Sequence, residues 1–198
     1  MAVILHVDDD KIWLDNVQRE IKHIHRRGHR ETVFLLPRVT LTEALCVIDG
    51  TDQKMAEYTE MGRKLDAVVL DLLMHGGRAE DVRTWAQKVR DMAKIPSAQW
   101  PSLSLGQLAK TLSESSLDEL GEKCPAVPAG RLATKHGAKV VIFSHLLDDR
   151  LPLLPLREFD IETQRKLIMA ACGASAYIVK TDDNWDAKLR DTLGRLLS

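Results

Sequence analysis

An open α/β fold is the architecture that this sequence predicts, with parallel strands that alternate with helices. Four short apolar runs have the length of buried strands, and each ends in or is followed by a polar residue. The segments between these runs carry apolar residues at helical spacing. Alternation of this kind favours a parallel sheet that is covered by helices on both faces. The candidate site lies at the four endings, which are Asp8, Asp71, Ser144 and Lys180.

The N-terminal part of the chain predicts three strands and three helices. Residues 11–25 carry apolar side chains close to helical spacing, so we expect a helix there, with the basic residues 23–30 as its solvated end. Pro37 favours an edge position or an early end for the second strand. The remaining elements of this part are strands at 3–7, 33–39 and 66–70 and helices at 42–48 and 80–92.

Residues 95–137 differ in character from the segments on either side. Prolines at 96, 101, 125 and 128 interrupt this stretch, and residues 103–120 predict two helical pieces with a break near 113–116. The leucines and Trp100 favour a packed helical segment over a disordered one. We therefore expect one domain over residues 1–198, with residues 95–137 as a helical or loop segment inserted between the third and fourth strands.

The C-terminal part predicts two more strands, which gives five in all. Residues 148–155 form a loop that prolines stiffen, and Asp160 is a good N-cap for the helix that follows. Gly173 suits the position after the end of that helix. The predicted strands of this part are 139–144 and 176–180, and a last helix covers about 184–197.

Composition sets limits on the environment and on the partners. The formal net charge is −1, so no strong electrostatic attraction to nucleic acid or to an anionic membrane follows. The three cysteines lie far apart and form no CxxC pair, which favours a reduced, cytoplasmic protein. We see no signal peptide and no apolar run long enough to span a bilayer, so no membrane insertion is expected.

The strand endings predict phosphoryl chemistry. Asp8, Asp9 and Asp10 follow the first strand and Asp71 follows the third, and the carboxyl ends of parallel strands are where open α/β sheets form sites. Carboxylates gathered there repel each other unless a cation joins them, which predicts a hard divalent metal such as Mg²⁺. A carboxylate nucleophile in phosphoryl transfer also needs a lysine and a hydroxyl to contact the phosphoryl oxygens.

These motifs, in this order, resemble the receiver domain of two-component response regulators. The resemblance covers both ends of the chain, whereas residues 78–136 do not match the family. It implies a flavodoxin-like, doubly wound, five-stranded parallel sheet in a stand-alone receiver, since no second domain follows the last helix. The matching motifs are VDDD at 7–10, VLDLLM at 69–74, IFS at 142–144 and ACGASAYIVK at 171–180.

The resemblance also implies a role for each site residue. Asp71 would accept the phosphoryl group with Lys180 and Ser144 beside it, and Tyr177 would be the aromatic switch residue. The implied Mg²⁺ ligands are Asp9, Asp71 and the backbone carbonyl of Leu73, with Asp8 acting through water. The implied partners are a histidine kinase or a phosphotransfer protein, and a downstream protein that reads the surface change. The oligomeric state stays open, and the chain would be a self-phosphorylating acceptor at most, not an enzyme.

Two positions depart from the family pattern. Thr181 follows Lys180 where the family has a proline with a cis peptide bond, so the peptide is either trans or strained. His145 follows Ser144 where the family has a small residue, so it could narrow access to the phosphoryl site or point away from it. Trp85, Trp100 and Trp185 are expected to be packing groups.

Two other functions remain open at this point. A degenerate receiver would act as a binding module without phosphorylation. A phosphatase of the haloacid dehalogenase type would use Asp8 as nucleophile and Asp10 as acid and base, with Ser144 as its second motif and Asp182 and Asp183 as late metal ligands. That alternative leaves Asp71 without a role.

Overall fold

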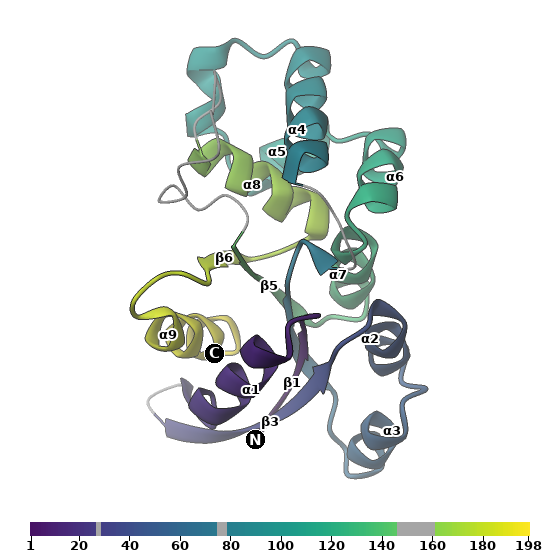
Figure 1. The fold of residues 1–198 in the computed structure, drawn as a ribbon, viewed down its shortest axis with the longest axis vertical. Coiled ribbons are helices and arrows are strands. Elements are labelled where there is room, and N and C mark those ends of the chain that lie inside the picture. Colours follow the sequence, from purple (N-terminus) through teal and green to yellow (C-terminus); the bar gives the residue numbers. More distant parts are fainter. Residues whose placement is uncertain (27–28, 75–78, 146–160) are drawn as a thin grey trace.

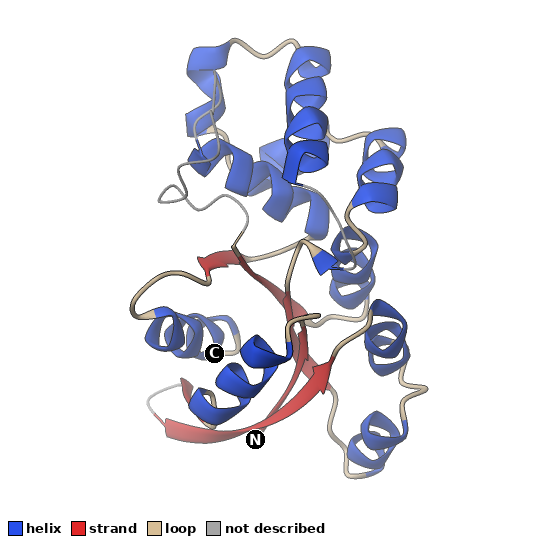
Figure 2. Ribbon diagram, in the orientation of Figure 1, coloured by secondary structure: helices blue, strands red, loops and turns tan. Residues whose placement is uncertain are grey.

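A six-stranded sheet forms the centre of the computed structural model, which describes residues 1–26, 29–74, 79–145 and 161–198 (Figures 1 and 2). The strand order is β2-β3-β1-β4-β5-β6, in which β2 is antiparallel to β3 and the other pairings are parallel. The five strands that pair in parallel follow the doubly wound order of flavodoxin-like sheets, so the predicted fold class is confirmed, whereas β2 is a sixth strand that the sequence did not predict. The strands are β1 Ala2–Val7, β2 His23–Arg26, β3 His29–Arg38, β4 Leu65–Leu70, β5 Lys139–Ser144 and β6 Ala176–Val179.

Helices cover both faces of this sheet. On one face, α1 and α9 pack over a cluster of apolar side chains that includes Ile4, Val69 and Phe143. On the other face, α2, α7 and α8 pack over a larger cluster, and α4, α5 and α6 lie outside them at the top of Figure 1. The helices are α1 Lys11–Glu20, α2 Leu41–Ile48, α3 Gln53–Glu60, α4 Ala79–Ala93, η2 Ser97–Ser102, α5 Leu105–Thr111, α6 Glu114–Lys123, α7 Ala126–Lys135, α8 Ile161–Cys172 and α9 Trp185–Leu196.

Strand β2 corrects the predicted helix at residues 11–25. The helix ends at Glu20, and residues 23–26 form an antiparallel pair with the first part of β3 instead of a solvated helix end. Ile24 is fully buried against the α9 side of the sheet. A Cβ on Gly194 would lie 2.2 Å from the carbonyl oxygen of His25, so α9 approaches β2 more closely than any other residue at position 194 would permit. This tertiary contact favours the extended conformation over a longer helix.

Strand β3 is shared between two neighbours along its length. Residues 29–32 pair with β2, and residues 33–38 pair with β1. Pro37 pairs with His6 of β1 in the second part, beyond the reach of β2. Because proline has no N–H to donate, it suits a position where a strand has a neighbour on one side only. The prediction that Pro37 marks an edge therefore holds for this end of β3.

The region before β5 is helical and packed. The two helical pieces predicted within residues 103–120 are α5 and α6, and Ser113 caps the second of them. The indole N–H of Trp85 in α4 donates a hydrogen bond of 2.6 Å to the carbonyl of Ser116 in α6. Lys166 of α8 donates to the carbonyl of Pro101 in η2. Trp85 and Trp100 are both 1% exposed, as expected of packing groups.

Three helices of the described chain were not predicted: α3, α7 and the short 3-10 helix η2. Helix α7 contains Pro128 and begins after Pro125, and these prolines made the segment resemble a loop. Pro128 lies in the first turn, where a helix needs no N–H from that residue. The predictions at 148–155 and at Asp160 lie outside the described residues. In the part of the chain that the structure describes, no helix has both the length and the apolar character needed to cross a membrane.

Candidate functional site

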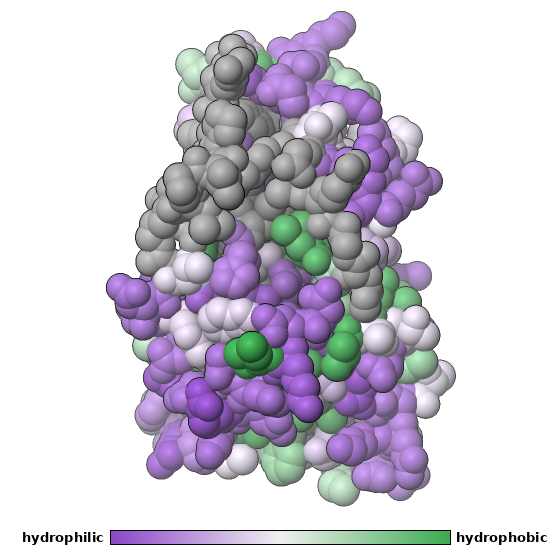
Figure 3. All heavy atoms as spheres, in the orientation of Figure 1, coloured by the Kyte–Doolittle hydropathy of each residue, from purple (hydrophilic) through white to green (hydrophobic). Residues whose placement is uncertain are grey.

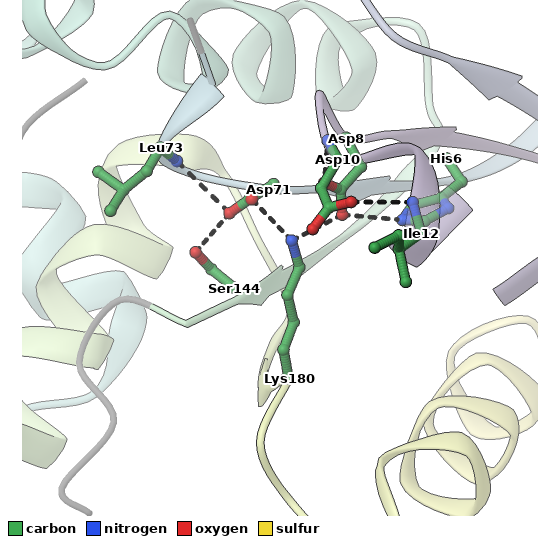
Figure 4. A network of polar contacts seen from close by, with 8 residues as sticks. All are labelled: His6, Asp8, Asp10, Ile12, Asp71, Leu73, Ser144 and Lys180. Atoms are coloured by element: carbon green, nitrogen blue, oxygen red, sulfur yellow. Dashed lines mark hydrogen bonds and ion pairs between the residues drawn. The ribbon is translucent and has the colours of Figure 1, made fainter. Parts of the chain in front are cut away.

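Four strand ends meet at one edge of the sheet and bring their polar side chains together (Figure 4). Asp8 follows β1 and Asp71 follows β4, and these two strands are neighbours in the sheet. The chain continues from β1 into α1 on one face and from β4 toward the helices of the other face, which is the arrangement at which open α/β sheets form sites. Ser144 ends β5 and Lys180 follows β6, on the far side of β4 from β1.

Lys180 holds the two buried carboxylates together. Its Nζ lies 2.6 Å from Oδ2 of Asp8 and 2.7 Å from Oδ2 of Asp71. The side chain of Lys180 is 1% exposed, and those of Asp8 and Asp71 are 0% and 10% exposed. Removing these charges from water is costly unless they are paired with good geometry. The short contacts provide that pairing, and they leave one negative charge in excess.

Asp71 has partners on both of its side-chain oxygens. Oδ1 accepts a hydrogen bond from the hydroxyl of Ser144, and the backbone N–H of Leu73 lies 3.4 Å from the same atom. Oδ2 accepts from Lys180. A hydroxyl donor and an ammonium thus contact the carboxylate that the sequence predicts as the nucleophile. Leu73 contributes its N–H here, and a role for its carbonyl as a metal ligand stays a prediction.

The carboxylates of Asp8, Asp9 and Asp71 fit a hard divalent cation. Each offers an oxygen that lies within 4.8 Å of the others, and Asp9 is exposed whereas the other two are buried. Carboxylate oxygens are the ligands that Mg²⁺ prefers, and the exposed Asp9 leaves a side open to water, which Mg²⁺ retains when bound. Asp10 does not belong to this group. Its side chain accepts from the N–H of Ile12 at 2.8 Å and caps α1.

His6 is a site neighbour that the sequence prediction missed. It is fully buried in β1 on the same face as Asp8, and its Nε2 lies 3.6 Å from Oδ2 of Asp8. Burial lowers the pKa of His6 below 6.5, against the smaller raising effect of Asp8. Burial raises the pKa of Asp8, but the contacts with His6 and Lys180 outweigh it and hold this pKa below its ordinary value. Alternation along β1 was the available signal, because residues 6 and 8 share a face.

Aromatic rings enclose the ammonium of Lys180. Nζ lies 5.6 Å from the ring centroid of Trp13 and 5.7 Å from that of Phe143. Trp185 packs edge-on against Trp13, as a packing group should, and His145 lies edge-on to Trp13 with 5.5 Å between the centroids. The structure therefore places the His145 ring against this aromatic group, and its effect on access to the phosphoryl site stays a prediction. Cations within about 6 Å of an aromatic face are attracted to it, so the rings help to hold the ammonium in place.

Lys180 reaches the carboxylates without a cis peptide bond. None of the peptide bonds among the described residues is cis, so the bond to Thr181 is trans. The backbone N–H of Lys180 donates to the carbonyl of Ser144 at 3.2 Å, which fixes the end of β6 against the end of β5. The departure from the family pattern at Thr181 therefore leaves the lysine within reach of Asp71.

Tyr177, the predicted switch residue, lies beside α8. It is half-buried in β6, and the guanidinium of Arg165 in α8 lies 5.6 Å from its ring centroid. Burial raises the pKa of the Tyr177 hydroxyl well above its ordinary value, so this group stays protonated. Its predicted part in switching stays a prediction.

Cys124 connects the loop after β4 to the outer helices. Its thiol donates a hydrogen bond of 3.1 Å to the carbonyl of Leu72, the residue that follows Asp71. Burial raises the pKa of Cys124 to about 12, so it is a neutral donor and not a nucleophile at ordinary pH. The end of α6 thus contacts the segment that carries the candidate nucleophile.

Comparisons with known proteins give one similar solved structure. No protein-family model matches the chain, and no curated protein matches it. The chain is similar to a structure described as a response regulator receiver domain protein (CheY-like) from Methanospirillum hungatei JF-1, with 16% sequence identity and a TM-score of 0.42. The alignment covers 99% of this chain and 96% of that chain. The chemistry of the site follows from its own side chains.

Proposed function

We propose that this protein is a phosphoacceptor receiver that takes a phosphoryl group on Asp71. One observation carries the proposal: the Asp71 carboxylate lies between Ser144 and Lys180, with Asp8 and Asp9 beside it. A carboxylate that only stabilised the fold would need one of these neighbours, not all of them. The donor would be a phosphohistidine on a histidine kinase or on a phosphotransfer protein.

Each residue has a defined part in this transfer. An oxygen of Asp71 attacks the phosphorus, a new O–P bond forms, and the P–N bond to the donor histidine breaks. The departing imidazole nitrogen keeps the bonding electrons and takes a proton. The Lys180 ammonium is near enough to shift from the carboxylates to a phosphoryl oxygen, and the Ser144 hydroxyl can turn from Asp71 to donate to another.

Mg²⁺ is part of the proposal. Asp9 and Asp71 would hold it with the carbonyl of Leu73, and Asp8 would act through water. When bound, the ion supplies positive charge that neutralises the phosphoryl oxygens. With that charge present, the phosphoryl group would not be repelled by the three carboxylates.

We propose an acceptor and not an enzyme that acts on a separate substrate. A phosphatase of the haloacid dehalogenase type would need Asp10 free as an acid and base, whereas its carboxylate caps α1. Such an enzyme would also need Asp182 as a metal ligand, whereas this residue pairs with Lys188 at 2.6 Å. Both observations favour the acceptor, whose signal would pass to a downstream protein through a surface change at Tyr177 or at the outer helices.

Incubation with a small-molecule phosphodonor and Mg²⁺ tests the proposal. The intact protein should gain the mass of one phosphoryl group, and peptide mapping should locate it on Asp71. Asp71→Asn should abolish the gain. Asp10→Asn is the matched control, because asparagine caps a helix as well as aspartate does and the gain should persist.

Two results would contradict the assignment. A label that survives Asp71→Asn and disappears in Asp8→Asn would favour the phosphatase. A wild-type protein that takes no label, with either the small phosphodonor or a phosphorylated histidine kinase, would favour a binding module that works without phosphorylation. Mg²⁺ titration followed by NMR separates these outcomes further, since Asp9→Ala should remove the shifts near Asp71.

A further inference from the structure

A groove runs between α6 and α7, on a part of the molecule that the phosphoryl site does not use. Its volume is about 470 Å³. Leu117 and Val127 form part of its floor and are nearly inaccessible, whereas Leu132 is half-buried and Pro128 is exposed. The groove is therefore an apolar depression that is open to solvent on one side.

The rim of the groove is charged on the α6 side. Asp118 and Glu122 both line it and are exposed, one helical turn apart. Within the described ranges neither of them makes an ion pair. Arg131 lines the opposite wall, but it already pairs with Glu114 at 3.4 Å. The rim therefore carries two acidic side chains that no described basic residue pairs with, and the surface over α6 is hydrophilic in Figure 3.

Gly121 lines the groove without placing a side chain in it. It lies in the interior of α6 and lines the groove between the two acidic residues. A Cβ there would lie 3.6 Å from Cδ of Pro128, which is an ordinary van der Waals contact. Packing therefore does not require glycine, and glycine is a poor helix former. A larger side chain at this position would fill the space between α6 and α7.

We propose that this groove binds a protein segment that is both apolar and positively charged. A bulky apolar side chain of the partner would sit on Leu117, Val127 and Leu132. Lysine or arginine about one helical turn away would face Asp118 and Glu122. An amphipathic helix in an apolar groove presents its side chains with this spacing. The inference does not depend on phosphorylation of Asp71, and its test needs no phosphodonor.

A library of random peptides displayed on phage, selected on the full chain, tests this assignment. The selected sequences should combine leucine, isoleucine, methionine or phenylalanine with lysine or arginine three or four residues away. The best peptide is then synthesised with a fluorescent label, and its Kd is measured by anisotropy. Raising the salt concentration should weaken its binding, because exposed charges are screened.

Three variants locate the binding. Gly121→Leu keeps every charge, favours the helix and fills the groove, so it should reduce affinity at least ten-fold, on the order of one well-placed apolar side chain. Asp118→Lys combined with Glu122→Lys should reduce affinity by about ten-fold through repulsion at the rim. Glu57→Lys combined with Glu60→Lys makes the same charge change on exposed positions of α3 and should leave the Kd unchanged.

Other outcomes would overturn the proposal. Peptides that show no preference for basic residues, or that bind Gly121→Leu as tightly as the wild type, would place the binding elsewhere or reject its chemistry. Sedimentation of the chain alone provides a separate check. A dimer of the wild type that is lost in Gly121→Leu would assign the groove to a second copy of the chain instead. Circular dichroism of each variant should match the wild type, so that unfolding does not account for a loss.

Discussion

The carboxyl edge of the sheet and the outer helices α4, α5 and α6 are stabilised in different ways. At the edge, Lys180 joins Asp8 and Asp71 away from water. In the outer helices, a neutral hydrogen bond from Trp85 to the carbonyl of Ser116 is buried. Their ion pairs, such as Lys88 with Glu119, lie at the surface.

This difference is the one expected if the edge of the sheet carries the proposed chemistry and the outer helices form a packing layer. Buried ion pairs seldom stabilise a fold more than apolar residues of similar volume would, because desolvation offsets the attraction. The proposed phosphoryl transfer accounts for such a pairing at the edge of the sheet. The outer helices follow the opposite rule, with apolar groups and an indole inside and charges outside, as a packing layer requires.

The largest expected effect follows from removing the buried cation. Lys180→Met leaves two buried carboxylates without a counter-charge and should lower the free energy of unfolding by about 3–5 kcal/mol. Lys88→Met breaks an exposed pair and should lower it by less than about 1 kcal/mol. Urea denaturation without metal measures both.

Mg²⁺ should restore part of the stability of Lys180→Met, because the ion replaces the missing positive charge. It should stabilise Lys88→Met only as much as it stabilises the wild type, because that variant keeps both Lys180 and the carboxylates. Equal losses in the two variants would remove the contrast between the two regions. The absence of any stabilisation by Mg²⁺ in either variant would reject the carboxylates as the binding site.

A smaller loss is expected at the indole of the outer helices. Trp85→Phe removes the donor to the Ser116 carbonyl and leaves a small cavity, which together should cost about 2–3 kcal/mol. Hydrogen exchange should show that amides of α4 and α6 lose protection together, whereas those of β1 and β4 change less. Unchanged protection in α6 would mean that the bond does not hold the two helices together.

The residues of the candidate site could be predicted from the sequence because their position depends only on where the parallel strands end. Parallel strands place their carboxyl ends on one edge, so Asp8, Asp71, Ser144 and Lys180 had to meet once the strands were identified. His6 was overlooked because it lies within an apolar run. Its position two residues before Asp8 would have placed it on the same face.

Strand β2 and helix α7 could not be predicted in the same way. Ile21 and Ile24 are three residues apart, a spacing that fits a helix. In the fold, residues 23–26 instead form a strand that packs against α9. That contact depends on Gly194, which is far away in the sequence. Pro128 signals a loop unless its position in the first turn of a helix is known. The conformation of β2 therefore depends on a contact between residues far apart in the sequence. That of α7 depends on where the helix begins.

The buried His6 beside the candidate site should make the stability of the protein depend on pH. Burial lowers the pKa of His6 below 6.5, so the unfolded chain binds a proton that the folded protein does not. Stability should therefore fall as the pH decreases below 6.5, by up to about 1.4 kcal/mol per pH unit, until the folded-state pKa is reached. Asp8, whose pKa is also lowered, adds its own loss only at pH values near and below 3.8.

His6→Leu should flatten the curve of stability against pH below 6.5 in metal-free buffer. His25→Gln removes an exposed histidine and is the matched control. Denaturant midpoints at several pH values measure the slope for each protein. A slope that persists in His6→Leu would assign the acid sensitivity to other groups.

The smallest changes in stability are expected from replacing a helix N-cap residue in each of the two regions. Asp10 caps α1 beside the site, and Ser104 caps α5 in the outer helices through a box with Gln107. Alanine at either position should cost about 1 kcal/mol, because backbone N–H groups lose their acceptor, whereas asparagine should restore most of it. If the two regions unfold as one unit, both alanine variants should lower the global midpoint equally. If the outer helices open first, Ser104→Ala should speed hydrogen exchange in α5 alone and leave the midpoint of the sheet unchanged, whereas Asp10→Ala should still lower it.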